Sequence, residues 1–328
     1  MLISESLPLP TDTKRSPSAS GRRITVVFNP TAGARRRARL TATLDLLRRS
    51  GCEIALYPTA AKGDAEAIAR ALGSNGAADM LVVAGGDGTI NEAVNGLLAE
   101  ANGTLPPLAL VPLGTANVLA AEIGLALSPA AVAHAITDGV PTRAYVGTAN
   151  GRCFTAMAGV GFDAHVVANV SLRLKRWLGK GAYVLESLRQ LFRFGFPGYR
   201  VTVDGRTFEA ASVIVAKGHY YAGRFVCAPD ARIDAPELHV CLFERNGRWN
   251  ALRYALALIL GRLPRLPDVR IVRGHSVSIT GPQGDPVQGD GDIIATLPVQ
   301  IGLAFRQLPL TVPPPPPAAC STLDRPAG

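Results

Sequence analysis

The sequence has few cysteines, and none of the spacings that disulfide scaffolds or zinc sites use. Its five cysteines are scattered along 328 residues and form no CxxC pair. An odd, dispersed set of thiols argues against a disulfide framework and against a thiolate zinc site. The five histidines show no metal-ligand spacing either. The chemistry of this chain therefore has to come from other side chains.

Long apolar runs are also missing. The longest, YALALIL at Tyr254–Leu260, sits between Arg253 and Arg262. It is far shorter than the roughly 20 residues that cross a bilayer. The N-terminal segment has no continuous apolar core of the kind found in signal peptides. These features predict a soluble, cytoplasmic protein.

Acidic residues are outnumbered by basic ones. The 34 Lys and Arg residues against 25 Asp and Glu give a formal net charge of +9. Such an excess suggests an anionic partner: nucleic acid, an acidic membrane surface or a phosphorylated substrate. Because the sequence shows no aromatic stacking platform and no nucleic-acid-binding motif, we expect no nucleic-acid partner.

The pattern of apolar residues changes once along the chain. From residue 23 to 142, strand-like runs such as ITVVF, MLVVA and LALVP alternate with helical spacing. This rhythm predicts an α/β domain, a parallel sheet in three layers with helices on both faces. From 143 to 296 hairpins dominate, with Asn150-Gly151 and Asp204-Gly205 suited to tight type I′ turns. The second domain is predicted to be an antiparallel β-sandwich.

The two ends of the chain differ in composition from the rest. We expect a disordered tail over residues 1–22, rich in Ser, Pro and Thr, and a proline-rich tail over residues 312–328. The last strands, at about 297–311 and including VQIGLAF (Val299–Phe305), are candidates to return to the first domain. The domain boundary is therefore left open at this end.

The stretch VVAGGDGTINEAVNGL (Val82–Leu97) breaks a strand with three glycines around Asp87 and resumes with helical spacing near Ile90. It matches neither the P-loop nor the GxGxxG fingerprint. Glycines let the backbone approach a ligand closely, and a helix N-terminus offers free N–H groups, which together suit phosphate. Taken alone, a glycine-rich turn with Asp87 as helix cap explains the stretch equally well.

Two further loops favour a binding site. VVFNPTAG and LALVPLGTANVLA each follow a predicted strand, and they contribute Asn29, Pro30, Gly33, Gly114, Thr115 and Asn117. The carboxyl ends of parallel strands border the crevice in which open α/β sheets bind ligands. Three polar, glycine-bearing loops at this edge predict a nucleotide site, in the cleft between the two domains.

The motifs NPTAG, GGDGTINE and PLGTANVLA, in this order and spacing, resemble the diacylglycerol kinase catalytic family. This family includes bacterial lipid kinases and sphingosine and ceramide kinases, and it shares its N-terminal fold with NAD kinases. The resemblance continues through GVGFDA, LGKGAYVLESL, YYAGRFVCAPDARID and QGDGD (Gln288–Asp292), and so covers nearly everything between the tails. It implies a magnesium-dependent kinase that transfers a phosphoryl group from ATP to a diacylglycerol-like lipid, giving a phospholipid such as phosphatidic acid.

The resemblance also implies roles for individual residues. Nucleotide contacts would come from Asn29, Pro30, Gly33, Gly85, Gly86, Asp87, Gly88, Thr89, Glu92, Gly114, Thr115 and Asp292. Asn117 would lie on the substrate side of the cleft. Glu92 follows Thr89 by three residues, so it could also close a capping box on its own helix.

Phosphoryl transfer to an alcohol needs a group that accepts the hydroxyl proton. Two aspartates compete for this catalytic role. Asp290 matches the family's Asp-Gly-Glu motif, and Asp87 matches the GGDG aspartate. The sequence favours Asp290 as the base and Asp87 as a nucleotide or magnesium contact. Without the resemblance, the segment around Asp290 would be interpreted as a polar loop.

Three departures from the family pattern bear on substrate and metal. Val118 stands where the family has an aspartate, Asp292 replaces the usual glutamate, and of an Asp-Asp-Gly motif only Asp234 remains as a candidate metal ligand. These changes leave other acceptors open: a sphingoid base, ceramide, another lipid alcohol or NAD. A non-catalytic regulator that binds lipid or nucleotide also stays open.

A kinase of this kind would meet its lipid at a membrane. Two basic clusters, Arg35–Arg39 and a helical insert at about 172–194 that includes Trp177, predict transient contact with the anionic inner membrane surface. The alternative is that both clusters are solvated helix faces. The sequence leaves a homodimer open.

Overall fold

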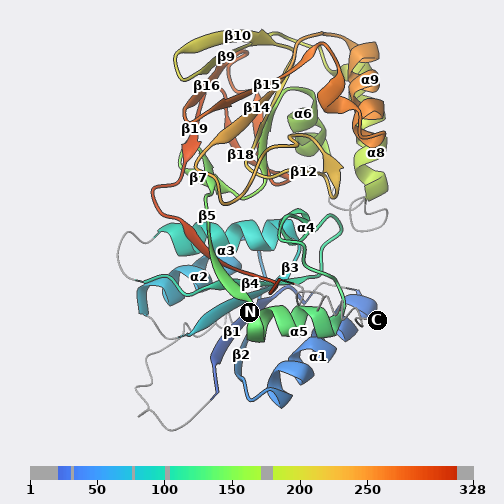
Figure 1. Ribbon diagram of the computed structural model, residues 1–328. Helices are drawn as coiled ribbons and strands as arrows, with labels where there is room; N and C mark the ends of the chain where they lie inside the picture. The colour runs from blue at the N-terminus through green and yellow to red at the C-terminus, as the bar shows by residue number, and fades with distance from the viewer. Residues whose placement is uncertain (1–20, 31–32, 76–77, 100–103, 171–179, 316–328) are drawn as a thin grey trace, which may run out of the picture.

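The computed structural model describes residues 21–30, 33–75, 78–99, 104–170 and 180–315. Within these residues the chain forms an α/β domain and a β-rich domain, one above the other in Figure 1. The predicted fold class is confirmed for both domains. Residues 1–20 and 316–328 of the predicted tails, and residues 171–179 of the helical insert, lie outside the described residues. No helix in the described ranges is long and apolar enough to cross a bilayer.

The first domain is built on a mixed sheet with the strand order β2-β1-β3-β4-β20-β5, parallel except for β5. Helices α2 and α3 pack on one face, and α1 and α5 on the other (Figure 1). Its elements are β1 Arg23–Phe28, α1 Ala34–Arg49, β2 Glu53–Pro58, α2 Asp64–Asn75, β3 Met80–Gly85, α3 Asp87–Ala99, β4 Leu108–Pro112, α4 Val118–Glu122, α5 Pro129–Asp138, β5 Val140–Ala144 and β20 Leu308–Val312.

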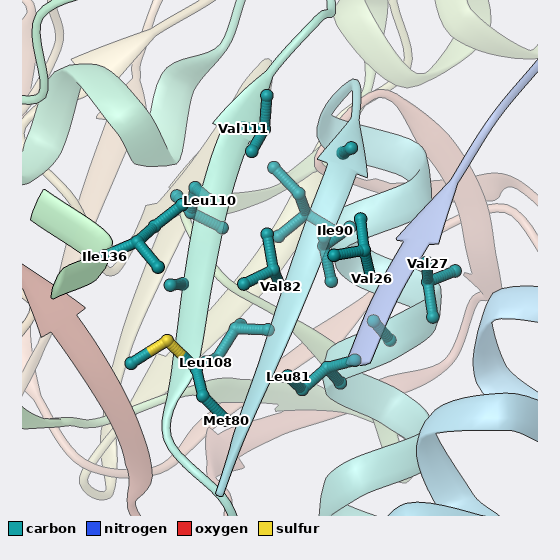
Figure 2. Packing of buried hydrophobic residues seen from close by; sticks show 14 of the residues in the cluster. Val26, Val27, Met80, Leu81, Val82, Ile90, Leu108, Leu110, Val111 and Ile136 are labelled. Carbon is teal, nitrogen blue, oxygen red and sulfur yellow. The ribbon is translucent and has the colours of Figure 1, made fainter. Parts of the chain in front are cut away.

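The core of this domain forms because β3 and β4 are apolar along their whole length and buried on both faces. Figure 2 shows Val82 and Leu110 of these strands packed beside Ile90 of α3 and Ile136 of α5. Helix α5 begins after Ser128, whose side chain caps it by accepting a hydrogen bond from the Ala131 N–H at 3.3 Å.

The second domain is a sandwich of two antiparallel sheets, β10-β9-β16-β19-β6-β7 and β15-β14-β11-β8-β17-β18, with an apolar core between them. Its strands are β6 Gly147–Ala149, β7 Arg152–Phe154, β8 Met157–Val160, β9 Tyr199–Val203, β10 Arg206–Ala210, β11 Ser212–Ala216, β12 Tyr220–Tyr221, β13 Phe225–Val226, β14 Leu238–Phe243, β15 Val269–Gly274, β16 Val277–Thr280, β17 Pro286–Gly289, β18 Asp292–Thr296 and β19 Val299–Leu303. Its helices are α6 Phe162–Asn169, α8 Lys180–Arg193, α9 Arg248–Ile259 and the 3-10 turn η1 Leu263–Arg265.

Two hairpin turns of this domain show the predicted backbone. Asn150 and Gly151 have φ angles of 46° and 84°, and Asp204 and Gly205 have φ angles of 44° and 82°. Positive φ at both central residues is the requirement of a type I′ turn, which Asn-Gly and Asp-Gly meet at low cost. The short turns fix the register of β6 with β7 and of β9 with β10.

The segment predicted as a return to the first domain divides between the two domains. β19 stays in the sandwich, paired with β16 and β6. Only β20 crosses over, where it pairs with β4 and β5. The chain thus passes twice between the domains, from β5 to β6 and from β19 to β20 (Figure 1). A double connection restricts how far the two domains can separate.

Candidate active site

The loops after β1, β3 and β4 meet at the carboxyl edge of the first sheet. The Leu113 N–H donates to the Gly85 carbonyl at 2.8 Å, and the Asn29 N–H donates to the Ala84 carbonyl at 3.2 Å. The backbones of Gly86 and Gly114 touch, so that a Cβ added to Gly114 would lie 2.6 Å from the Gly86 Cα. Only glycine permits this approach, which explains its use in both loops.

Helix α3 begins at Asp87, three residues before the start expected near Ile90. Gly88 and Thr89 therefore belong to its first turn rather than to the preceding loop. The free N–H groups of this turn face the edge of the sheet at which the loops meet. A helix N-terminus carries about half a positive charge, so the position suits an anion.

The region around Asn29 is bordered by basic side chains. The Arg36 guanidinium donates to Thr115 Oγ1 at 3.3 Å, which links the start of α1 to the loop after β4. A hollow of about 220 Å³ opens beside Asn29, lined by Phe28, Asn29, Arg37, Leu40, Thr41, Leu44, Leu56 and Leu113. Gly33 caps α1, and a Cβ added there would meet nothing within 4 Å, so the space next to it is open. Pro30 ends this loop's described part, since Thr31 and Ala32 lie outside the described residues.

Asp87 ties two of the loops together. Its carboxylate accepts hydrogen bonds from the backbone N–H groups of Asn117 at 2.9 Å and Val118 at 2.7 Å, one on each oxygen. Burial and the neighbouring charge of Asp290 raise the pKa of the Asp87 carboxyl, although these two hydrogen bonds oppose the shift. Because a carboxylate has about four acceptor positions, both oxygens of Asp87 can accept a further donor.

Asn117, whose N–H group donates to this carboxylate, is a buried polar residue with an unusual backbone conformation. It is 8% exposed and has a left-handed backbone with a φ of 50°. Its side-chain N–H group donates to the Gly114 carbonyl, but its Oδ1 has no hydrogen-bond partner among the described residues. A buried acceptor without a donor costs free energy, so the fold holds Asn117 in this position at a cost in stability.

Asp290 is in a different situation, because its acceptor positions are filled. Oδ1 accepts from the N–H groups of Ala156 and Met157 at 2.9 and 3.2 Å. Oδ2 accepts from the Thr155 N–H at 2.6 Å, the Thr155 hydroxyl at 2.9 Å and the Asn91 side chain at 3.0 Å. Five donors leave no lone pair for a substrate hydroxyl. This geometry argues against Asp290 as the base that the sequence favours.

Two asparagines that the sequence analysis missed connect the domains at this point. Asn91 donates to Asp290 and to the Cys153 carbonyl at 2.9 Å, and Asn95 accepts from the Cys153 N–H at 2.9 Å. Both are buried on α3, four residues apart, on a face that is otherwise apolar. The sequence feature that could have identified them is the spacing of four residues, which puts two amide side chains on one otherwise apolar face of the helix. They attach α3 to the strand that precedes Thr155.

Glu92 and Asp292 form an acidic pair on the other side of α3. The backbone N–H groups of Gly63 and Ala65, at the start of α2, lie near the Glu92 carboxyl and favour its charged form. Burial, together with the nearby charge of Asp292, raises the pKa of the Glu92 carboxyl. The Lys62 ammonium lies 3.6 Å from Asp292, and a Cβ added to Gly88 would lie 3.3 Å from the same carboxylate. Asp292 therefore reaches from the second domain to the first turn of α3.

Asp234 lies apart from these groups. Its carboxylate pairs with the Arg232 guanidinium through two hydrogen bonds of 2.8 and 2.9 Å, and this partner lowers the pKa of the Asp234 carboxyl. Among the described residues, no three His, Cys, Asp or Glu side chains come together in a way that could hold a metal ion. The structure gives no support to Asp234 as a metal ligand.

Two family models match the chain along most of its length. The model of the diacylglycerol kinase catalytic domain matches residues 23–149, and that of the YegS C-terminal NAD kinase beta sandwich-like domain matches residues 156–312. The chain belongs to the diacylglycerol kinase catalytic family. As a member of this family it is a kinase, and the resemblance seen in its motifs is confirmed.

Relatives of this kinase are similar along nearly their full length. The diacylglycerol kinase of Staphylococcus saprophyticus is 27% identical over 281 residues, which cover 84% of this chain and 91% of the relative. That of Bacillus subtilis is 25% identical over 296 residues, 89% of this chain and 97% of the relative. A crystal structure of a diacylglycerol kinase from Bacillus anthracis is 26% identical, with a TM-score of 0.72, and covers 91% of this chain and 99% of that one.

The contact between Gly86 and Gly114 gives a testable prediction for this kinase. We expect Gly114→Ala to weaken ATP binding at least tenfold, because the new Cβ forces the two loops apart. Gly198→Ala is the matched control, since a Cβ added there meets nothing within 4 Å. Titration calorimetry with ATP compares the two variants with the parent. Equal affinities for all three proteins would show that the loops do not bind the nucleotide.

Proposed function

We propose that this kinase transfers the γ-phosphoryl group of ATP to the hydroxyl of a diacylglycerol-like lipid, giving ADP and a phosphatidic acid. The observation that carries the proposal is the Asp87 carboxylate. It lies where three glycine-bearing loops of the first domain meet the Asp290 turn of the second, and it keeps acceptor positions free. A carboxylate in this place suits the removal of a proton from an alcohol.

Nucleotide phosphates fit the first turn of α3. Gly85, Gly86 and Gly88 allow close approach of the backbone, and Thr89 adds a hydroxyl beside its N–H group. Arg36 and Lys62 border the same edge and supply positive charge. We assign Asn29, Pro30 and Gly33 to the adjoining wall of the site, with Gly114 and Thr115 opposite.

Magnesium fits the acidic pair formed by Glu92 and Asp292. Burial, and to a smaller extent the charge of Asp292, raises the pKa of Glu92, so a cation between the two carboxylates would stabilise their charged forms. Mg²⁺ is commonly held by one or two carboxylates together with the phosphates of a substrate. Bound there, it would neutralise charge on the phosphates. Asp292 is one methylene shorter than glutamate, and in the structure it also contacts Lys62.

The chemical step then needs little beyond correct placement. Asn117 holds the loop after β4 in place, because its side-chain N–H group donates to the Gly114 carbonyl. Asp87 takes the hydroxyl proton as the lipid oxygen attacks the γ-phosphorus. The bond from that phosphorus to the β-γ bridging oxygen breaks, and ADP leaves. Asp290 holds the Thr155–Met157 segment against α3 through its five hydrogen bonds.

We propose diacylglycerol as the acceptor because the relatives of this kinase are named diacylglycerol kinase. A lipid of this class stays in the bilayer, so the enzyme would work as a peripheral protein at an anionic surface. Its placement in the cytoplasm, at the inner membrane, stays a prediction of the sequence. Because Val118 changes a position near Asn117, the acceptor has to be tested directly.

The test is transfer from γ-labelled ATP to lipid alcohols in mixed micelles, with diacylglycerol, sphingosine, ceramide and NAD as acceptors. We expect labelled phosphatidic acid as the main product, and no transfer when magnesium is removed with a chelator. A labelled sphingoid phosphate, ceramide phosphate or NADP as the main product would replace diacylglycerol as the acceptor. ATP binding without turnover on any acceptor would favour a regulatory protein.

A further inference from the structure

Helix α8 is oriented against the usual rule for surface helices, which bury their apolar stripe and expose their polar one. Among its described side chains, the two that are buried are polar: Glu186 and Gln190 are 5% and 6% exposed and share a hydrogen bond of 2.9 Å. Its apolar side chains face outward, with Phe192 77% exposed. The reversal leaves a hydrophobic stripe that no described part of the chain covers.

Helix α9 carries a second stripe of the same kind. Trp249, Leu252, Leu256 and Ile259 recur at spacings of three and four residues and are all exposed, Trp249 at 76%. The opposite face is anchored in the core through Tyr254, whose ring packs edge-on against Phe243. Helices α8 and α9 contact each other on one side of the second domain (Figure 1). Together they form an apolar ridge, defined as Val184, Leu185, Leu188, Phe192, Trp249, Leu252, Leu256 and Ile259.

The exposed charge around the apolar ridge is mostly positive. Helix α9 contains no acidic residue, and the single acidic residue of α8, Glu186, is buried. Among the described residues, the exposed charges on and beside the two helices are Glu244 and six arginines: Arg189, Arg193, Arg245, Arg248, Arg262 and Arg265. Three arginines of this surface contact a buried carboxylate, Arg189 that of Glu186, and Arg245 and the half-buried Arg253 that of Asp268. A hydrophobic strip edged by arginines complements an anionic lipid surface, in which the apolar side chains reach the acyl region and the arginines meet phosphates. Two copies of the ridge facing each other would bring these arginines together, which disfavours a second copy as the occupant.

The apolar ridge also adjoins the reaction centre. Tyr183, in the first turn of α8, lies so close to the Asp290 turn that a Cβ added to Gly291 would be 3.9 Å from its hydroxyl oxygen. The same helix that starts beside the Asp290 turn thus continues outward into the exposed stripe. A lipid drawn partly out of a bilayer under α8 would meet this turn with its polar end first.

We propose that the apolar ridge is the surface by which this protein docks on anionic phospholipid bilayers, with the Asp290 turn brought near the membrane beside α8. The proposal deepens the proposed function, since a lipid kinase has to reach an acceptor that stays in the bilayer. It also assigns the contact to α8 and α9 rather than to the basic cluster Arg35–Arg39 on α1 of the first domain.

The first experiment is sedimentation with vesicles of phosphatidylcholine containing one-third phosphatidylglycerol, at low salt. It compares the parent with the double variant Phe192→Gln/Leu256→Gln and with Phe305→Gln. Phe305 is a matched control because it is fully exposed and lies between β19 and β20, away from the ridge. We expect binding to fall about tenfold for each ridge side chain removed, and to be unchanged in the Phe305 variant. No binding by the parent, or equal binding by all three proteins, would overturn the proposal.

A second experiment separates docking from catalysis. On a short-chain, water-dispersed diacylglycerol the ridge variant should turn over at the parent rate, whereas on long-chain diacylglycerol in the same vesicles its rate should fall at least tenfold. Equal losses on both acceptors would contradict a docking role. If the parent phosphorylates neither acceptor, the proposed function fails, while sedimentation still decides the ridge. A parent that is dimeric in the ultracentrifuge, with a monomeric ridge variant, would assign the surface to a second copy instead.

Discussion

Asp290→Asn should lower the free energy of unfolding by about 3 kcal/mol, in addition to removing most of the activity. The wild-type carboxylate accepts from backbone N–H groups on both oxygens. An amide has one oxygen and one NH₂ group, so in either orientation the NH₂ group faces at least one backbone N–H donor. That donor is left without a partner, and the Thr155–Met157 segment loses its attachment to α3. Urea unfolding of the parent and the variant measures the difference.

Asp87→Asn is the matched control for this experiment, because it makes the same chemical change one loop away. The protein raises the pKa of Asp87, which means that the fold disfavours the charged carboxylate relative to the neutral form. An amide at position 87 also opposes one backbone N–H donor with its NH₂ group, because Asn117 and Val118 donate to different oxygens. Position 290 has three backbone donors and two side-chain donors, so we expect the loss of stability to be smaller at position 87 than at position 290. Both variants could instead unfold like the parent, with Asp290→Asn losing only turnover. In that case Asp290 is the base, and it does not stabilise the Thr155–Met157 segment as we infer.

The parts of the site that the sequence predicted are those set by local chemistry. Gly86 and Gly114 mark loops where backbones touch, and this requirement is visible in each loop separately. The Asn-Gly and Asp-Gly turns likewise need only their own two residues. The strands leading to these loops are apolar along their length, so their place in a covered parallel sheet also followed from pattern.

The parts that the sequence could not supply depend on contacts between distant segments. Asn91 lies in a helix that would form with or without it, and its role appears only when Cys153 and Asp290 are placed against α3. Asp290 resembles a free catalytic carboxylate in sequence, because its five donors come from positions 91 and 155–157. The sequence offered the last strands as candidates to return to the first domain, but which of them does so depends on long-range pairing: β20 pairs with β4, whereas β19 stays in the sandwich.

The second large effect expected is on catalysis at Asp87. Asp87→Asn should reduce kcat by about 10²- to 10⁴-fold, the usual contribution of a positioned general base, while ATP binding changes little. In the parent, kcat should fall as the pH drops through the pKa of Asp87, because only the carboxylate form accepts the proton. Burial and Asp290 raise that pKa, so the fall should begin above the ordinary range for aspartate, near 3.9. The residual rate of Asp87→Asn should lack this acid limb.

Asp290→Asn provides an independent check on the same assignment. The negative charge of Asp290 contributes to the raised pKa of Asp87, so its removal should shift the acid limb of the remaining activity to lower pH. A base at position 290 predicts a different outcome, since its loss would abolish the acid limb instead of moving it. Profiles of kcat between pH 4.5 and 8, measured with saturating ATP and dispersed diacylglycerol, distinguish the two. The direction of the shift thus identifies which aspartate takes the proton.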